Sequence, residues 1–196
     1  MGNREWTGVV IAIAVAASGC DRTPSARATT VVDSVIPREE ALRRFREGTP
    51  PVESLTGGER SRDALVQAFV RALEASDTNA LRGLVMTKAE YAWLYYPTSP
   101  QGLPPYDLSP ALYWFMLEGR GAQGFAHLLA ERAGQPLRVT GYSCDRVFSQ
   151  EGDNRIHGPC LLQRFQAASD TGSERLFGPI LERGGRFKFV NYANRL

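Results

Sequence analysis

Three short turn sequences divide the C-terminal part of the chain into four extended segments, and this division restricts the fold more than any other feature. The turns are QEGDN, SDTGS and RGG, and the extended segments cover about residues 137–148, 155–167, 174–183 and 185–193. Turns this short join antiparallel neighbours, because a parallel crossover needs a much longer connection. In the last segment Phe187 and Phe189 alternate with Lys188, which is typical of a half-buried strand. The pattern predicts a four-stranded antiparallel meander sheet.

Two cysteines report on the register of the first predicted hairpin. If this hairpin centres on Gly152, Cys144 and Cys160 lie directly opposite each other. A cross-strand disulfide is then geometrically plausible, and it would contribute about 3 kcal/mol in the chain-entropy model. No metal site is expected, because two cysteines and two scattered histidines lack the ligand spacing of a zinc finger.

The residues before the sheet, from 61 onwards, carry start signals for several helices. The expected N-terminal caps are Ser61, Asp77, the capping box of Thr87 and Glu90, and Ser109 before Pro110. Glycines at 119–121 are expected to separate a fourth helix from a fifth, which ends at Gly134. Helices followed by a meander predict an α+β class with the helices packed on one face of the sheet.

The N-terminal segment predicts export from the cell. An uncharged run extends from Trp6 to Cys20 and is centred on GVVIAIAVAA. A membrane-spanning helix needs about 20 apolar residues, whereas a signal peptide has a shorter apolar region followed by small residues. We therefore expect this segment to be processed. One alternative is an ordinary secretory signal cut after Ala16, which would leave Cys20 as a free thiol.

The end of this segment, Ala17-Ser18-Gly19-Cys20, resembles the lipobox of bacterial lipoproteins, although that motif usually carries Leu where this chain has Ala17. The resemblance implies cleavage of residues 1–19 and a lipid on Cys20 that anchors the protein in the bacterial cell envelope. Cysteine parity agrees with this, because lipidation of Cys20 leaves Cys144 and Cys160 as an even pair.

Residues 20–60 have the composition of a flexible tether. They are rich in Thr, Ser, Pro and Gly with balanced charge. One short segment, IPREEALRRFREG, is predicted to form a marginal helix in which Glu39 and Glu40 stand four residues before Arg43 and Arg44. This helix is expected to fray, or to dock through Leu42 and Phe45.

The element order of residues 61–196, helices first and a meander afterwards, resembles the NTF2-like (SnoaL-like) superfamily. The resemblance rests on element order and length and involves no specific motif. It implies a sheet curved around a helix into a cone with a cavity, which members of the superfamily use for acid–base catalysis, binding or assembly. Fold alone does not choose among these roles.

Few residues of this chain suit catalysis. His157 in RIHGPC and Asp107 before the fourth helix are the weak candidates for an acid–base group, while His127 lies among apolar helical residues. No phosphate-binding loop, nucleophile motif or cofactor motif is present, so no cofactor is expected. The formal net charge is only +2 and no basic cluster is interleaved with aromatics, so nucleic-acid binding is not predicted.

Aromatic residues concentrate around a proline-rich loop between residues 90 and 117. Such residues at helical spacing usually form core, but they also suit a ligand pocket or a partner surface. The candidates for such a surface are Tyr91, Trp93, Tyr95, Tyr96 and Tyr113.

The first functional hypothesis is a non-enzymatic, lipid-anchored envelope protein that binds a protein partner or a small apolar ligand. The alternative is a cavity enzyme of isomerase or hydrolase type, in which His157 or Asp107 works with a tyrosine hydroxyl. A third hypothesis is a purely structural role in the envelope, with an exposed aromatic patch and no pocket.

Overall fold

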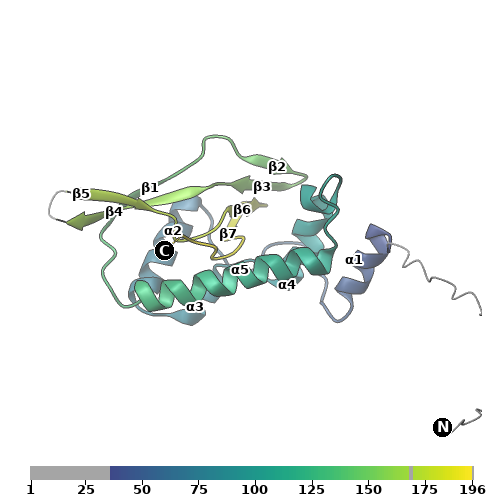
Figure 1. Cartoon of the computed structure of the whole chain (residues 1–196), viewed down its shortest axis with the longest axis horizontal. Helices are drawn as coiled ribbons and strands as arrows, with labels where there is room; N and C mark the ends of the chain where they lie inside the picture. Colours follow the sequence, from purple (N-terminus) through teal and green to yellow (C-terminus); the bar gives the residue numbers. More distant parts are fainter. Residues whose placement is uncertain (1–35, 168–169, 196) are drawn as a thin grey trace, which may run out of the picture. The chain divides into compact units, whose positions relative to one another are not determined.

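The strands form two antiparallel sheets in the computed structural model, which describes residues 36–167 and 170–195 (Figure 1). The first sheet has the order β1-β4-β5 and the second the order β2-β3-β6-β7. The strands are β1 (Val139–Cys144), β2 (Ser149–Glu151), β3 (Asn154–His157), β4 (Cys160–Ala167), β5 (Asp170–Glu174), β6 (Ile180–Arg183) and β7 (Arg186–Phe189). The α+β class is as predicted, but the strands belong to two sheets and not to one sheet of four strands.

The two sheets arise because the chain crosses from one sheet to the other at three interruptions, which lie between β1 and β2, between β3 and β4 and between β5 and β6. The strands β2 and β5 differ from the prediction, because Gln150 and Glu151 of β2 lie in the predicted turn QEGDN and most of β5 lies in the predicted turn SDTGS. The interruptions contain Pro159 and Pro179, which have no N–H group to donate to a ladder, and Gly158, whose φ is 140°. The meander order survives, since β2 pairs with β3, β3 with β6 and β6 with β7.

The register of the first hairpin confirms the predicted cysteine pair. Cys144 lies opposite Cys160 in the β1–β4 ladder, and the two form a disulfide. Beyond the interruption, Glu151 lies opposite Asn154, so the hairpin centres between Gly152 and Asp153 and not on Gly152 itself. The register therefore shifts by one residue between the β1–β4 ladder and the β2–β3 ladder, where the chain passes from one sheet to the other.

Side-chain caps start four of the helices where the sequence predicts them. Ser61 caps α2 (Arg62–Glu74), Asp77 caps α3 (Thr78–Gly83), Thr87 and Glu90 form the capping box of α4 (Lys88–Glu90), and Ser109 caps α5 (Pro110–Glu131). After α4 the chain continues as a π-helical turn, η1 (Tyr91–Tyr95), and two 3₁₀ turns, η2 (Tyr96–Thr98) and η3 (Pro100–Gly102). The regular α-helix therefore ends at Glu90, and Pro97 lies within the 3₁₀ turn η2.

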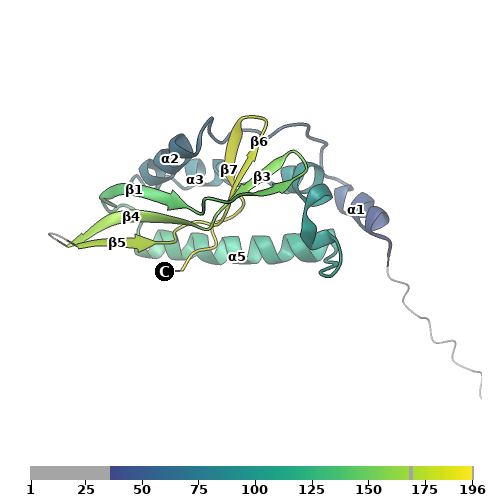
Figure 2. The same ribbon diagram turned by 90° about the horizontal axis from the view of Figure 1, so that it is seen from above.

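The predicted break at residues 119–121 is wrong, because α5 is continuous. Its glycines serve close packing and do not end the helix. A Cβ atom on Gly124 would overlap the carbonyl oxygen of Tyr192, and one on Gly121 would lie 3.1 Å from Cβ of Asn191. The C-terminal segment therefore packs directly on α5, which runs alongside the strands of both sheets (Figure 2).

Residues 36–60 pack on the folded body, although the sequence places them in a flexible tether. Helix α1 (Arg38–Arg46) buries Leu42, and Leu55 is 4% exposed. Glu59 exchanges two backbone hydrogen bonds with Phe187 of β7, at 3.0 and 2.8 Å. Residues 36–60 thus belong to the folded region, while the predicted signal peptide, the lipobox and residues 20–35 of the tether lie outside the described residues.

Two apolar clusters form the core. The first joins α2 to β4, β7 and the segment that follows β5, and it contains Phe69, Leu162, Phe177 and Phe189. The second joins α1, η1 and the start of α5 to β6, and it contains Tyr91, Tyr96 and Leu181. The sheet of β2, β3, β6 and β7 contributes residues to both clusters, so parts of both its faces are covered.

Candidate functional site

Four of the five aromatic residues that are candidates for a ligand or partner surface are buried. Tyr91 and Tyr96 are 0% and 1% exposed, and Tyr95 and Tyr113 are also buried. Their hydroxyl groups find partners inside the protein: Tyr91 donates to the carbonyl of Pro110 at 2.9 Å and Tyr96 to that of Leu108 at 2.8 Å. Trp93 is partly buried under the guanidinium group of Arg46. The rings pack inward because η1 lies between α1, α5 and β6.

A cavity of about 720 Å³ lies between α5 and the strands, and we call it the α5–sheet cavity. One face of α5 lines it with Tyr113, Met116, Leu117 and Arg120, which are spaced as the stripe of one helix face. The opposite wall comes from the segment around β2 and β3, from the β5–β6 connection and from the C-terminal segment, and it includes Phe148, Ile156, Pro159, Arg175, Pro179 and Val190. The lining is mostly apolar and the volume is within the usual range for small-molecule sites, about 300–1,000 Å³.

Two tyrosine hydroxyls and two guanidinium groups are the ionisable groups on this lining. The hydroxyl oxygens of Tyr95 and Tyr113 lie 3.2 Å apart and share a hydrogen bond. Burial raises the pKa of both tyrosines, so their hydroxyls stay protonated near neutral pH. Among the described residues that line the cavity there is no carboxylate and no histidine. The cavity therefore has hydrogen-bonding and positive groups but lacks an acid–base group suited to catalysis near neutral pH.

Glu151 lies close to this lining and was missed by the sequence analysis. Burial raises the pKa of its carboxyl group, against the opposing hydrogen bond from Ser149. Its Oε2 atom is buried without a hydrogen-bond partner among the described residues, and its charge raises the pKa of both Tyr95 and Tyr113. Sequence offers no signal for this environment, since a glutamate in the turn sequence QEGDN resembles an ordinary solvated residue.

The two predicted acid–base candidates lie outside the cavity lining. His157 is on β3 between Ile156 and Gly158, which do line the cavity, and its own side chain points to the other face because side chains alternate along a strand. There its Nε2 atom contacts Glu182 Oε2 at 2.7 Å, and its ring lies beside that of Phe148. Asp107 is exposed and does not cap α5, since Ser109 does. His127 is also exposed.

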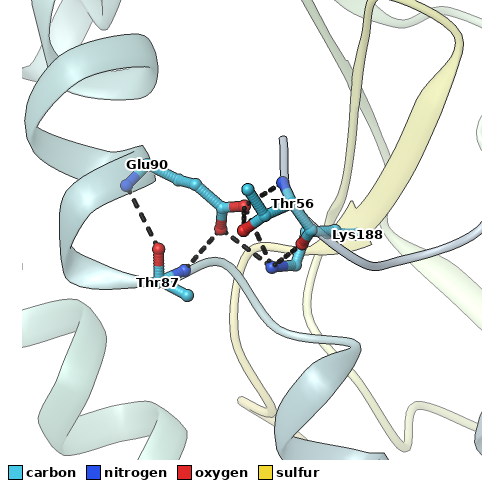
Figure 3. A network of polar contacts seen from close by, with 4 residues as sticks. All are labelled: Thr56, Thr87, Glu90 and Lys188. Atoms are coloured by element: carbon cyan, nitrogen blue, oxygen red, sulfur yellow. Dashed lines mark hydrogen bonds and ion pairs between the residues drawn. The ribbon is translucent and has the colours of Figure 1, made fainter. Parts of the chain in front are cut away.

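A buried ion pair ties three segments together away from the α5–sheet cavity (Figure 3). Lys188 of β7 donates from Nζ to Glu90 Oε2 at 2.8 Å and to the carbonyl of Thr56 at 3.0 Å. The Glu90 carboxylate also accepts hydrogen bonds from the backbone N–H groups of Thr56 and Thr87, each at 2.7 Å. We call these four residues the Glu90 network.

The Glu90 network is structural, because both charges are satisfied within it. Glu90 and Lys188 are 0% and 1% exposed. Burial alone favours the neutral acid, but the hydrogen bonds from Lys188, Thr87 and Thr56 outweigh it and hold the pKa of Glu90 below its ordinary value. With its polar partners already provided by the protein, the carboxylate is not presented to a ligand.

Neither a metal centre nor a membrane span is found in the part of the chain that the structure describes. No group of three or more His, Cys, Asp or Glu side chains is placed to hold a metal ion in residues 36–167 and 170–195. Over the same residues no helix combines the length and the apolar character needed to cross a bilayer.

Comparison of the chain with models of protein families, with curated proteins and with solved structures finds no match.

Proposed function

We propose that this protein is a lipid-anchored protein of the bacterial cell envelope that binds a small, largely apolar ligand in the α5–sheet cavity without chemical conversion. The observation that carries the proposal is the cavity itself, whose lining is mostly apolar and includes no histidine or carboxylate among the described residues. The enzymatic alternative, an isomerase or hydrolase, is less well supported, because His157 and Asp107 do not line the cavity.

We further propose that the folded region is an NTF2-like cone. Three observations support this: the helices precede the meander, the extended segments pass from one sheet to the other, and a cavity lies between the strands and α5. The anchor is supported by the lipobox-like AASGC sequence and by the disulfide, which uses Cys144 and Cys160 and leaves Cys20 as the unmatched cysteine.

Filling the cavity is expected to abolish ligand binding. Octanol serves as the apolar probe, titrated calorimetrically into the full chain held in nanodiscs of zwitterionic phosphatidylcholine, with empty nanodiscs as the blank. We expect saturable binding to the wild-type chain and binding weakened by about tenfold or more, or about 1.4 kcal/mol, in Met116→Trp. The indole would occupy the volume that the probe needs, because Met116 lines the cavity.

The matched control for this experiment is Leu112→Trp, on the same helix. Leu112 is 48% exposed and does not line the cavity, so this variant should bind octanol like the wild type. Thermal unfolding of both variants verifies that they are folded. Equal binding by the two tryptophan variants would contradict a site in the α5–sheet cavity.

The proposed lipid anchor predicts that Cys20→Ser loses the lipid modification. Two or three acyl chains hold a protein on a membrane far more firmly than one, and serine at this position offers no thiol for lipid attachment. We expect the wild-type chain in the membrane fraction after alkaline washing, and loss of the lipid modification by mass spectrometry in the variant. A wild-type chain without lipid on Cys20 would reject the lipobox interpretation.

A further inference from the structure

We infer that the ligand of the α5–sheet cavity is an amphipathic anion, in which a carboxylate or phosphate group pairs with Arg120 and Arg175 while an apolar chain fills the remaining volume. The inference rests on the proposed binding function and specifies its ligand class. Both arginines line the cavity, one from α5 and one from the β5–β6 connection, and no carboxylate is found among the described lining residues. The charged groups on the wall are therefore all positive.

Neither of these guanidinium groups is neutralised by a residue that the structure describes. Among the side chains that the structure describes, in residues 36–165 and 171–195, Arg120 and Arg175 have no ion-pair partner, and Nε of Arg175 is buried without a hydrogen-bond partner. Glu174, next in sequence to Arg175, forms its ion pairs with other arginines, since its Oε1 atom accepts from Arg132 at 3.3 Å and from Arg164 at 2.6 Å. A buried donor without a partner costs free energy, which a bound acceptor would recover.

The chemistry of arginine selects the head group. Guanidinium offers several N–H donors in a plane and pairs with carboxylate or phosphate in a bidentate manner. The hydrogen-bonded pair of Tyr95 and Tyr113 hydroxyls adds one neutral donor on the same lining, because the other hydroxyl hydrogen is used within the pair. Glu151, the nearby carboxyl group, does not line the cavity, and so does not present its charge directly to an anion there.

The rest of the lining selects the tail. Met116, Leu117, Ile156, Phe148 and Val190 present aliphatic and aromatic carbon to the interior of the cavity. A fully ionic ligand such as inorganic phosphate would leave this surface uncovered, whereas an alkyl chain would bury it. The arrangement fits a molecule with one anionic end, such as a fatty acid or a phosphorylated lipid fragment.

The test compares probes that share one tail and differ in the head. Octanoate, octyl phosphate, octanol and inorganic phosphate are titrated separately into the full chain in zwitterionic nanodiscs. We expect octanoate or octyl phosphate to bind at least about tenfold more tightly than octanol, which corresponds to about 1.4 kcal/mol. Arg120→Gln and Arg175→Gln should each reduce this ratio several-fold. Arg62→Gln, at a partly exposed arginine on α2 away from the cavity lining, should retain the wild-type ratio.

The outcomes separate the inference from the function on which it rests. Equal binding of octanol and both anionic probes would overturn the anionic head while leaving a ligand cavity. Failure of every octyl probe to bind would overturn the proposed function itself. Binding of inorganic phosphate as tightly as octyl phosphate would overturn the amphipathic ligand. Preference for octanoate or for octyl phosphate assigns the head as carboxylate or phosphate, and either result supports the inference.

Discussion

Replacing Lys188 with methionine is expected to lower the free energy of unfolding by about 3–5 kcal/mol, the cost of leaving a buried charge without its partner. Glu90 is fully buried, and Lys188 is the only cation that contacts its carboxylate among the described residues. Methionine keeps an unbranched side chain of similar length but removes the ammonium group that donates to Glu90 and to the Thr56 carbonyl. Urea denaturation of the full chain measures the loss.

The double variant Glu90→Gln/Lys188→Met is the control for this substitution. It removes both charges, while the glutamine oxygen can still accept one of the backbone hydrogen bonds from Thr56 or Thr87. The double variant should therefore be more stable than Lys188→Met alone, because the uncompensated carboxylate is gone. If the single and double variants were equally stable, the loss would come from packing and not from the charge on Glu90.

The stability difference between wild type and Lys188→Met should also depend on pH. In the wild type the pKa of Glu90 is lowered below its ordinary value, chiefly because hydrogen bonds from Lys188, Thr87 and Thr56 outweigh burial. This contribution is fully present above the pKa of the unfolded chain, about 4.3, and is lost as the pH falls through the lower folded pKa. In the variant, protonation of Glu90 removes the buried charge. The two proteins should thus converge in stability below about pH 4, and a constant difference across this range would contradict the electrostatic explanation.

Lys188 shows where local sequence pattern stops being informative. Its alternation with Phe187 and Phe189 predicts a strand with one polar face, and β7 forms as expected. The face carrying Lys188 is buried nonetheless, because the segment around Thr56 and the start of η1 cover it. Those segments are distant in sequence, and one of them belongs to the expected tether. The capping box of Thr87 and Glu90 was predictable from four residues, whereas the second role of Glu90 depends on long-range packing.

The same distinction applies to the α5–sheet cavity. Hairpin turns and helix caps depend on neighbouring residues, so the start of α5 and the pairing of β1 with β4 could be predicted from the chain. The proposed anion-binding site needs Arg120 and Arg175 on one cavity lining, and no local sequence pattern relates these two residues. The aromatic-rich sequence around Tyr95 and Tyr113 makes both residues candidates for a ligand pocket, and the structure places both on the cavity lining. Tyr91 and Tyr96 had the same sequence signal but lie in the core.

Reducing the Cys144–Cys160 disulfide is expected to lower the free energy of unfolding by about 3 kcal/mol. The bond closes a loop across a separation of 16 residues, and the entropy of the unfolded chain rises when a loop of this length is opened. For a protein of this size the loss corresponds to a decrease in Tm of roughly 6–12 °C. Thermal unfolding with and without reductant measures it, at a concentration of reductant that is shown by thiol labelling to open the bond.

Two variants identify the bond responsible for this effect. Cys144→Ala/Cys160→Ala should unfold at the same temperature with and without reductant, whereas Cys20→Ser should keep the full response. The disulfide joins β1 and β4 immediately before the point where the chain crosses to the second sheet, and Cys160 is buried in the first core cluster. Opening the bond therefore frees the junction between the two sheets as well as the loop. An unchanged Tm after complete reduction of the wild type would show that this junction is held by the β1–β4 ladder and the core alone. A response of Tm in the double alanine variant would show that the reductant acts on something other than this bond.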